Sequence, residues 1–468
     1  MKRQAVFLTI VFARFLSAGN VPKLNFCDAS TLAPYFGTKT RYEEVNPHLL
    51  VDVRNINSSV LELPYKQCTP VYMNAVIRHG TRYPTAKNIK KMDQIYQLVM
   101  NKAQDPGQGW VEKIKKWEMW YNDSMDGQLA EKGKDDLRNL AFRMASAFPT
   151  LFTKKAFNGC HLQFITSSKH RCVDSTVAYI TGLARDYFEG TAEEEVNCKP
   201  EVNDELMRFF EHCRKFVVDI EENKTALMEV DLFKSKPEMM SVLEKMSERL
   251  QIPSSDLTPD LVEAAFLMCS YDLAVKNIDS PWCSLFDKDD AKILEYSSDL
   301  KQFWKRGYGH EINSKSSCKL FHDIFKHLEQ AHNESSRNDP ISFPVTVQVG
   351  HAETLLPLMS LMGFFKDSTP LTADNFAQQK ERLFRTSFIV PYASNLVFIL
   401  YHCEQSYRVQ LLLNEKPLLF PNLDDPAPLY SDVKNLYKDL LEGCDFAQEC
   451  HLPVKPKIIT EEKFGHEL

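Results

Sequence analysis

Hydrophobic and polar positions along this 468-residue chain follow two patterns. Short runs of apolar and β-branched residues predict buried strands, and longer segments with apolar periodicity predict helices. The expected strands are 71–77, 162–166, 345–349, 396–403 and 409–413. Each of the first three is followed by a loop and an expected helix, at about 84–104, 169–187 and 352 onwards. This alternation predicts an α/β sandwich.

Longer charged stretches with helical periodicity, such as Glu205–Lys215 and Leu261–Val275, separate these elements. They predict a mostly helical insertion, or cap, in two parts at 105–150 and 200–335. The α/β domain would then comprise 20–104, 151–199 and 336–468, including a C-terminal tail. A chain of this length exceeds one typical domain of roughly 100–200 residues, which agrees with a large domain that carries an insertion.

Composition narrows the function classes. Hydrophobic residues make up 44% and charged residues 25% of the chain, which is typical of a globular protein. The formal net charge of -7 gives no global positive field for binding nucleic acid. We therefore expect a globular protein with no nucleic-acid partner.

The N-terminus resembles a signal peptide covering residues 1–19. Lys2 and Arg3 precede the apolar run Ala5–Phe15, which only Arg14 interrupts, and small residues follow at 17–19. The run is too short to span a bilayer, and we expect no transmembrane segment. The last four residues, GHEL, resemble the KDEL class of retrieval sequences. Together, the signal peptide and the GHEL sequence predict that the protein resides in the lumen of the endoplasmic reticulum and binds a retrieval receptor. Secretion is the alternative.

Twelve scattered cysteines without a CxxC spacing favour disulfides over a zinc finger or a thioredoxin motif. Reduced core thiols in a cytosolic protein are the alternative. The pairing stays open, although Cys444 and Cys450 are close enough in sequence for a local pair. Four N-x-S/T sequons predict glycosylated surface loops, at Asn57, Asn122, Asn223 and Asn333.

The sharpest chemical motif is the sequence RHGTR at 78–82, directly after the first expected strand. Ligands of open α/β sheets bind at the carboxyl ends of strands. Arg78 and Arg82 offer planar donor groups that match phosphate oxygens. Their charge would lower the pKa of His79 and keep it neutral as a nucleophile. The alternative is a basic surface loop.

Two further loops follow strands in the same way. SSKHR at 167–171 is suited to an anion at a helix start, with Arg171 as the reaching side chain, or it is simply a solvated helix start. In the second loop, His351 and Glu353 could bind phosphate and donate a proton. Because the motif is not HExxH, it disfavours a zinc protease.

Taken together, RHGTRYP at 78–84, SSKHR and HAE at 351–353 resemble the histidine acid phosphatase family. Within that family the chain is most similar to the subgroup that acts on inositol polyphosphates. The stretches that carry this second similarity are 304–309, 312–313, 316–318, 350–363 and 390–398. The resemblance implies a central, mainly parallel sheet flanked by helices, with a helical cap inserted.

The resemblance also implies the roles of the motif residues. His79 would attack phosphorus and form a phosphohistidine. Glu353, in place of the family's more usual Asp one residue earlier, would donate a proton to the leaving group. The residues that would bind phosphate are Arg78, Arg82, Arg171 and His351. No metal or other cofactor would be needed.

The implied substrates are inositol hexakisphosphate and lower inositol polyphosphates, with 2,3-bisphosphoglycerate as a further candidate. A dense polyanion needs local positive charge on an acidic chain, and the lysines beside the basic loops are candidates, namely Lys87, Lys90, Lys91 and Lys169. A broad-specificity secreted acid phosphatase is the first alternative. A catalytically inactive glycoprotein that only binds inositol phosphates is the second.

Overall fold

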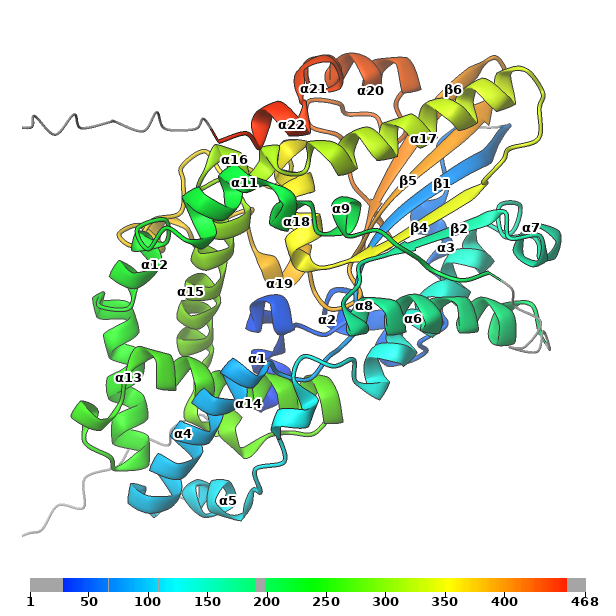
Figure 1. The fold of residues 1–468 in the computed structure, drawn as a ribbon. Coiled ribbons are helices and arrows are strands. Elements are labelled where there is room, and N and C mark those ends of the chain that lie inside the picture. Colours follow the sequence, from blue (N-terminus) through cyan, green and yellow to red (C-terminus); the bar gives the residue numbers. More distant parts are fainter. Residues whose placement is uncertain (1–27, 66, 108, 190–197, 453–468) are drawn as a thin grey trace, which may run out of the picture.

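A seven-stranded sheet forms the centre of the structure, a computed structural model that describes residues 28–65, 67–107, 109–189 and 198–452 (Figure 1). The strand order is β3-β2-β4-β1-β5-β6-β7. The bounds are β1 Cys68–Arg78, β2 Leu162–Thr166, β3 Glu201–Val202, β4 Val345–Gly350, β5 Asn395–Cys403, β6 Ser406–Leu413 and β7 Lys416–Pro417. All five predicted strands are confirmed. The two-residue strands β3 and β7 were not predicted, because neither has a hydrophobic run.

The sheet is parallel in one half and antiparallel in the other. Strands β3, β2, β4 and β1 pair in parallel, and β1, β5, β6 and β7 pair antiparallel. In the parallel half, Arg78 of β1 lies opposite Gly350 of β4, and Thr166 of β2 lies opposite Val349. The three chemical motifs therefore leave the sheet side by side, at its carboxyl edge.

Alternating side chains of β1 bury both faces of the sheet. Met73 and Ile77 join a hydrophobic cluster with helices α6 (Glu131–Ala147) and α8 (His170–Thr181). Tyr72 and Val76 face the other cluster, which includes helix α17 (Cys318–Ser336). Figure 1 shows these helices on opposite sides of the sheet. Helix α8 continues into a π-helical segment, Gly182–Tyr187. Together the two segments cover the helix expected at 169–187.

The other long helices lie beside the sheet on the side of its carboxyl edge (Figure 1). They are α4 Ala86–Lys102, α13 Pro237–Leu250, α14 Pro259–Lys276 and α15 Lys288–Arg306. Shorter helices are α1 Ala29–Leu32, α2 Tyr42–Val45, α3 Ser58–Leu61, α5 Trp110–Lys116, α7 Lys154–Asn158, α12 Met228–Phe233, α16 Glu311–Lys315, α18 Ala352–Leu361, α19 Thr386–Ile389, α20 Tyr430–Leu436, α21 Lys438–Gly443 and α22 Phe446–Glu449. Helices α6 and α17 fall within the two ranges expected to form the cap, but both pack on the sheet.

The expected helix at Glu205–Lys215 is divided into three pieces. They are α9 Asp204–Met207, α10 Phe209–His212 and α11 Arg214–Phe216. The backbone leaves the helical region at Arg208, with φ -132°, and again at Cys213, with ψ 95°. Cys213 is also held by a disulfide to Cys450. Tertiary constraints at these two residues therefore override the helical periodicity.

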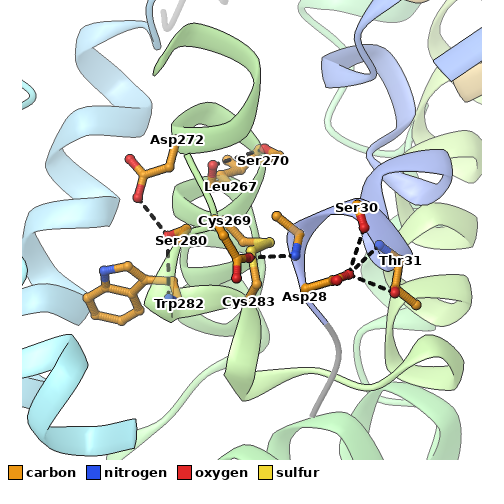
Figure 2. Close-up of a disulfide and its surroundings, with 12 residues drawn as sticks. Asp28, Ser30, Thr31, Leu267, Cys269, Ser270, Asp272, Ser280, Trp282 and Cys283 are labelled. Carbon is orange, nitrogen blue, oxygen red and sulfur yellow. Dashed lines mark hydrogen bonds between the residues drawn. A yellow bond between two sulfur atoms is a disulfide. The ribbon is translucent and has the colours of Figure 1, made fainter. Parts of the chain in front are cut away.

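Five disulfides confirm the expectation of long-range cross-links. The pairs are Cys68–Cys403, Cys160–Cys198, Cys213–Cys450, Cys269–Cys283 and Cys318–Cys444. The local pair Cys444–Cys450 is wrong, because each of these residues lies against a different helix and bonds there. Figure 2 shows Cys269–Cys283, which ties α14 to the segment that follows it. Cys172 is a free, buried thiol, and Cys27 lies outside the described residues.

The predicted signal peptide and the C-terminal GHEL also lie outside the described residues. Among the residues that the structure describes, no helix is both long and apolar enough to cross a membrane. The four sequon asparagines, Asn57, Asn122, Asn223 and Asn333, are all exposed.

Candidate active site

His79 is buried at the end of β1, in the first of the three loops that meet at the carboxyl edge of the sheet. Its Nδ1 lies 2.9 Å from the carbonyl oxygen of Gly80. Because a carbonyl only accepts, Nδ1 carries the proton and Nε2 keeps its lone pair. Burial, and then the charges of Arg78 and Arg171, hold the pKa of His79 well below its usual range. The site therefore contains a neutral imidazole with a free nitrogen, as the sequence predicted.

Helix α6 holds this loop in place. A Cβ on Gly80 would lie 2.1 Å from the carbonyl oxygen of Gly133, so only glycine permits this contact. One carboxylate oxygen of Asp136 accepts hydrogen bonds from the backbone N–H of Thr81 at 3.0 Å and from its hydroxyl at 2.7 Å. The other oxygen of Asp136 binds Lys132. These contacts with helix α6 therefore fix the loop between His79 and Arg82.

The three motif arginines contact neutral acceptors. Arg78 donates to the carbonyl oxygens of Thr38 and Val390, at 2.8 and 2.6 Å. The carbonyl of Tyr83 accepts from Arg82 at 2.7 Å. None of these acceptors carries a charge, so the positive charge of both arginines stays uncompensated by these bonds.

Arg171, at the start of α8, makes the same kind of contact. Its Nη2 lies 3.3 Å from Nδ1 of His351. Among the described residues, the buried Nε groups of Arg78, Arg82 and Arg171 have no hydrogen-bond partner. A buried guanidinium N–H group without an acceptor is energetically costly in a folded protein. Such groups are expected in a site that binds an anion, because the anion supplies the missing acceptor.

His351 lies across from His79, with ring centroids 5.7 Å apart. Its Nδ1 accepts from Arg171, so its Nε2 donates to the hydroxyl of Ser167, at 2.9 Å. Burial and the charge of Arg171 lower the pKa of His351 to about 3. Ser167 lies within the predicted loop, but the motif by itself predicts no role for it. The structure makes it the residue that orients His351.

Glu353 is the carboxylate that sequence analysis named in this loop. Burial alone would raise its pKa, but the nearby charge of Arg306 and the contribution of His351 hold that pKa well below its usual range. In the free site Glu353 is therefore ionised. It lines a cavity together with His351 and Arg171.

Two cavities flank the motif residues. The larger has a volume of about 650 Å³ and is lined by seven lysines, Lys39, Lys87, Lys91, Lys224, Lys234, Lys301 and Lys305. The smaller has a volume of about 430 Å³ and is lined by Lys169, Arg171, Arg208, Lys305 and Arg306, with His351 and Glu353. Three of the four predicted lysines, Lys87, Lys91 and Lys169, thus line a cavity. Lys90 is exposed and is not among the lining residues.

Lys39 is a site residue that the sequence did not reveal. It ends the short 3-10 helix Gly37–Lys39, in a segment without a recognisable motif. Burial and the charges of Arg82 and Arg78 hold its pKa well below the usual range, so its ammonium group is close to both arginines. The neighbouring carbonyl of Thr38 accepts from Arg78, which ties this segment to the site.

Within the described ranges, no group of three or more His, Cys, Asp or Glu side chains is arranged to hold a metal ion. The charged side chains of the site are instead mostly cationic. Such a set can bind and polarise a phosphoryl group through hydrogen bonds and charge.

A family model described as the histidine phosphatase superfamily (branch 2) matches residues 71–414, a range that contains every predicted site residue. The chain belongs to this superfamily. The resemblance inferred from the three motifs is thereby confirmed. As a histidine phosphatase, the chain is also similar to Multiple inositol polyphosphate phosphatase 1 of Homo sapiens. The two are 50% identical over 448 residues, which cover 91% of this chain and 90% of the human protein.

Solved structures show the same fold at low sequence identity. The phytase from D. castellii aligns with a TM-score of 0.73 and 16% identity, over 90% of this chain and 87% of the phytase. The Multiple Inositol Polyphosphate Phosphatase of Bifidobacterium longum, in complex with inositol hexasulfate, aligns with a TM-score of 0.67 and 13% identity. That alignment covers 90% of this chain and all of the bacterial one. The predicted α/β fold is therefore confirmed by comparison as well as by the sheet itself.

Proposed function

We propose that this histidine phosphatase hydrolyses the phosphomonoesters of inositol polyphosphates through a phosphohistidine on His79. The observation that carries the proposal is the neutral imidazole of His79 among arginines whose hydrogen-bond acceptors are all uncharged. A nucleophile of this kind needs no prior deprotonation, and the arginines draw a phosphate toward it.

In the first step, Nε2 of His79 attacks phosphorus while the bond to the leaving oxygen breaks. The hydrogen bond from Nδ1 to Gly80 stabilises the positive charge that develops on the ring. The guanidinium groups of Arg78, Arg82 and Arg171 stabilise the negative charge on the phosphoryl oxygens. His351 holds Arg171 from the facing side, because its Nδ1 accepts from that guanidinium group.

Glu353 donates a proton to the leaving alkoxide in this scheme. The cations around it keep the carboxyl group ionised in the free site. A bound phosphate would offset those cations and raise the pKa of Glu353, so that substrate itself promotes protonation of the donor. In the second step, water attacks the phosphohistidine, and the carboxylate of Glu353 takes up its proton. Phosphate then leaves and His79 is restored.

Inositol hexakisphosphate and lower inositol polyphosphates are the proposed substrates, with 2,3-bisphosphoglycerate as a further candidate. Support comes from the names of the human relative and the bacterial structure, the latter with inositol hexasulfate bound. The lysines and arginines of both cavities also favour a ligand with several phosphates. Broad-specificity acid phosphatase activity is the second candidate, and equal kcat/KM for inositol hexakisphosphate and p-nitrophenyl phosphate would favour it.

His79→Ala tests the mechanism most directly. We expect turnover to fall by about 10⁴-fold or more, since removing a nucleophile abolishes the covalent route. Circular dichroism should show that the fold is retained, and rapid alkaline denaturation of the wild type with labelled substrate should trap phosphohistidine. Activity should persist in EDTA. Turnover in the variant close to that of the wild type would refute the mechanism, as would its loss on chelation.

We further propose that the protein is a glycoprotein of the endoplasmic reticulum lumen, retrieved there through its GHEL sequence. Five disulfides and four exposed sequon asparagines support an oxidising, secretory compartment. Secretion is the alternative. Deleting the last four residues and measuring the secreted fraction distinguishes the two, because retrieval predicts a large increase in the medium.

A further inference from the structure

A buried carboxylate, that of Asp136 on α6, binds the same peptide group that holds the nucleophile. The peptide between Gly80 and Thr81 accepts from Nδ1 of His79 at its carbonyl oxygen, at 2.9 Å. Its N–H donates to Oδ2 of Asp136, at 3.0 Å. The peptide is trans, so its carbonyl and its N–H point in opposite directions. His79 and Asp136 therefore lie on opposite sides of one amide and are joined through it by two hydrogen bonds.

The two hydrogen bonds strengthen each other, because an amide is polarisable. The resonance that makes a peptide planar moves electron density from its nitrogen to its oxygen. A carboxylate that accepts from the N–H favours this shift and makes the carbonyl a stronger acceptor. The proton on Nδ1 of His79 therefore faces a carbonyl oxygen whose negative character depends on the charge of Asp136.

Hydrogen bonds and a lysine support the charge of Asp136 in its buried position. The side chain is 2% exposed. Its Oδ2 also accepts from the hydroxyl of Thr81 at 2.7 Å, and its Oδ1 binds Lys132. Burial alone would lower the pKa of Lys132, but the charges of Asp136 and Glu43 raise it above its usual range. Because Lys132 also binds Glu43, its charge is shared between two carboxylates.

The backbone on both sides of this peptide is held by other groups. The N–H of Gly80 donates to the hydroxyl of Ser175 on α8, at 3.1 Å. The carbonyl of Thr81 accepts from the N–H of Ala130, at 2.9 Å. The loop therefore keeps several contacts that do not involve Asp136. A carboxylate at this position supplies charge as well as a further hydrogen bond.

We propose that Asp136 is a positioning residue that stabilises the phosphohistidine through the peptide between Gly80 and Thr81. The inference rests on the proposed function and deepens it, since it identifies what balances the charge of the nucleophile. As Nε2 of His79 bonds to phosphorus and the ester P–O bond breaks, the ring becomes positive and the polarised carbonyl stabilises it. When water attacks, the P–N bond breaks and the ring is neutral again, so no proton leaves Nδ1.

A purely structural role for Asp136 predicts a different result. Arg82 belongs to the same loop as His79, so a displaced loop would weaken the binding of every anion that resembles phosphate. Stabilisation through the peptide acts only when Nε2 of His79 has formed a bond. Inorganic phosphate binds without such a bond. Vanadate accepts one from an imidazole nitrogen and so resembles the transition state, which makes the two anions a pair of probes.

Asp136→Asn removes the charge and keeps an oxygen that can accept from Thr81. We expect the rate of phosphohistidine formation to fall about 10-fold, measured in single turnovers by rapid alkaline denaturation with labelled inositol hexakisphosphate. The inhibition constant of vanadate should rise by a similar factor. The inhibition constant of inorganic phosphate should change by less than about twofold, which also reports that the site is folded.

Two further variants make the result specific. Asp135→Asn removes the neighbouring carboxylate of α6, which pairs with Arg138 at the surface, and should leave all three values unchanged. Glu43→Gln removes a carboxylate from the same lysine, but among the described residues the side chain of Glu43 donates or accepts no bond in the loop after β1. Its vanadate constant should therefore change by about twofold at most.

A fallback covers loss of folding in Asp136→Asn. The triple variant Glu43→Gln, Lys132→Met and Asp136→Asn removes the three buried charges together, so none is left without its partner. It should show the same selective loss of vanadate inhibition.

Unchanged vanadate inhibition in the folded variant would overturn the inference. Equal rises for vanadate and phosphate would also overturn it and leave Asp136 with the loop alone. A rise in Glu43→Gln as large as that in Asp136→Asn would replace the peptide route with a general effect of charge. None of these results bears on the proposed function, which fails if the wild type forms no phosphohistidine or if His79→Ala remains active.

Discussion

The arginines of the active site and those of a second buried cluster bond to different kinds of partner. In the second cluster, Arg382 donates to Asp299 at 2.6 Å and to Glu295 at 3.1 Å. Arg385 donates to Glu295 at 3.0 Å. Each positive charge there lies against a buried carboxylate. In the active site, by contrast, the acceptors of Arg78, Arg82 and Arg171 are carbonyl oxygens, a phenol and a histidine ring.

This difference separates a structural cluster from a binding site. Where carboxylates match arginines, the charges are satisfied within the protein, and the cluster joins α15 to the segment around α19. Where neutral acceptors hold the arginines, hydrogen bonds fix the side chains but leave their charge to act on a ligand. Burial alone therefore does not distinguish a functional arginine from a structural one. The charge of its hydrogen-bond acceptor distinguishes the two.

The largest effect on stability is expected in the second cluster, where carboxylates pair with the arginines. Arg382→Met would leave Asp299 and Glu295 without a main partner, and breaking a buried ion pair in this way costs about 3–5 kcal/mol. We expect the free energy of unfolding in urea to fall by that amount. Activity per folded molecule should be retained, because among the described residues the hydrogen bonds of Arg382, Asp299 and Glu295 do not go to the motif residues themselves. A variant as stable as the wild type would show that the cluster is not structurally important.

The same substitution in the active site should have the opposite consequences. Arg171→Met removes one donor to the phosphoryl oxygens, and kcat should fall by about 10²- to 10³-fold. The free energy of unfolding should change little, since no carboxylate loses its partner. Kinetics of Arg171→Met and Arg382→Met, measured side by side, give the change in kcat. Urea titrations of the same two variants give the change in the free energy of unfolding. If Arg171→Met mainly unfolds the protein, the distinction between the two groups is wrong.

A smaller effect should appear in the pH dependence of stability. His351 has a pKa of about 3 in the folded protein, because burial and Arg171 oppose its charge, against about 6.5 in an unfolded chain. Between these values the unfolded chain binds a proton that the folded chain does not, so acid favours unfolding. The slope is about 1.4 kcal/mol per pH unit.

His351→Asn is the variant that isolates this slope. Above pH 6.5 or so, the histidine is neutral in both states and contributes no pH dependence. On acidification toward pH 3, the wild type should lose stability faster than the variant. Urea titrations at several pH values measure the difference, and parallel curves would mean that His351 is protonated in the folded state.

Short-range patterns in the sequence locate the strands of the sheet and the residues that follow them. The strands at 162–166 and 345–349 were located within one residue, because buried parallel strands are continuous apolar runs. His79 and His351 stood out because each directly follows such a strand, and Arg171 because it lies at the start of the helix after one. Parallel strands place their carboxyl ends together, so three separate motifs could be expected to meet.

Other features depended on contacts between distant parts of the chain. Cys213 pairs with Cys450 across 237 residues, and spacing alone could not choose that partner. Lys39 carries no motif, and its segment is tied to the site by the bond from Arg78 to the carbonyl of Thr38. Arg306 lies within a stretch that resembles the family, but its place beside Glu353 is a property of packing. The boundaries of the cap stay a prediction.

By itself, the sequence determined the family, the strands of the sheet and the residues at its carboxyl edge. These follow from local hydrophobic periodicity and from motifs whose members are neighbours in the chain. Only the tertiary structure decided which arginines have no carboxylate as a hydrogen-bond partner. That property depends on whether a carboxylate from another segment packs against the guanidinium group, and a linear sequence does not contain that distance.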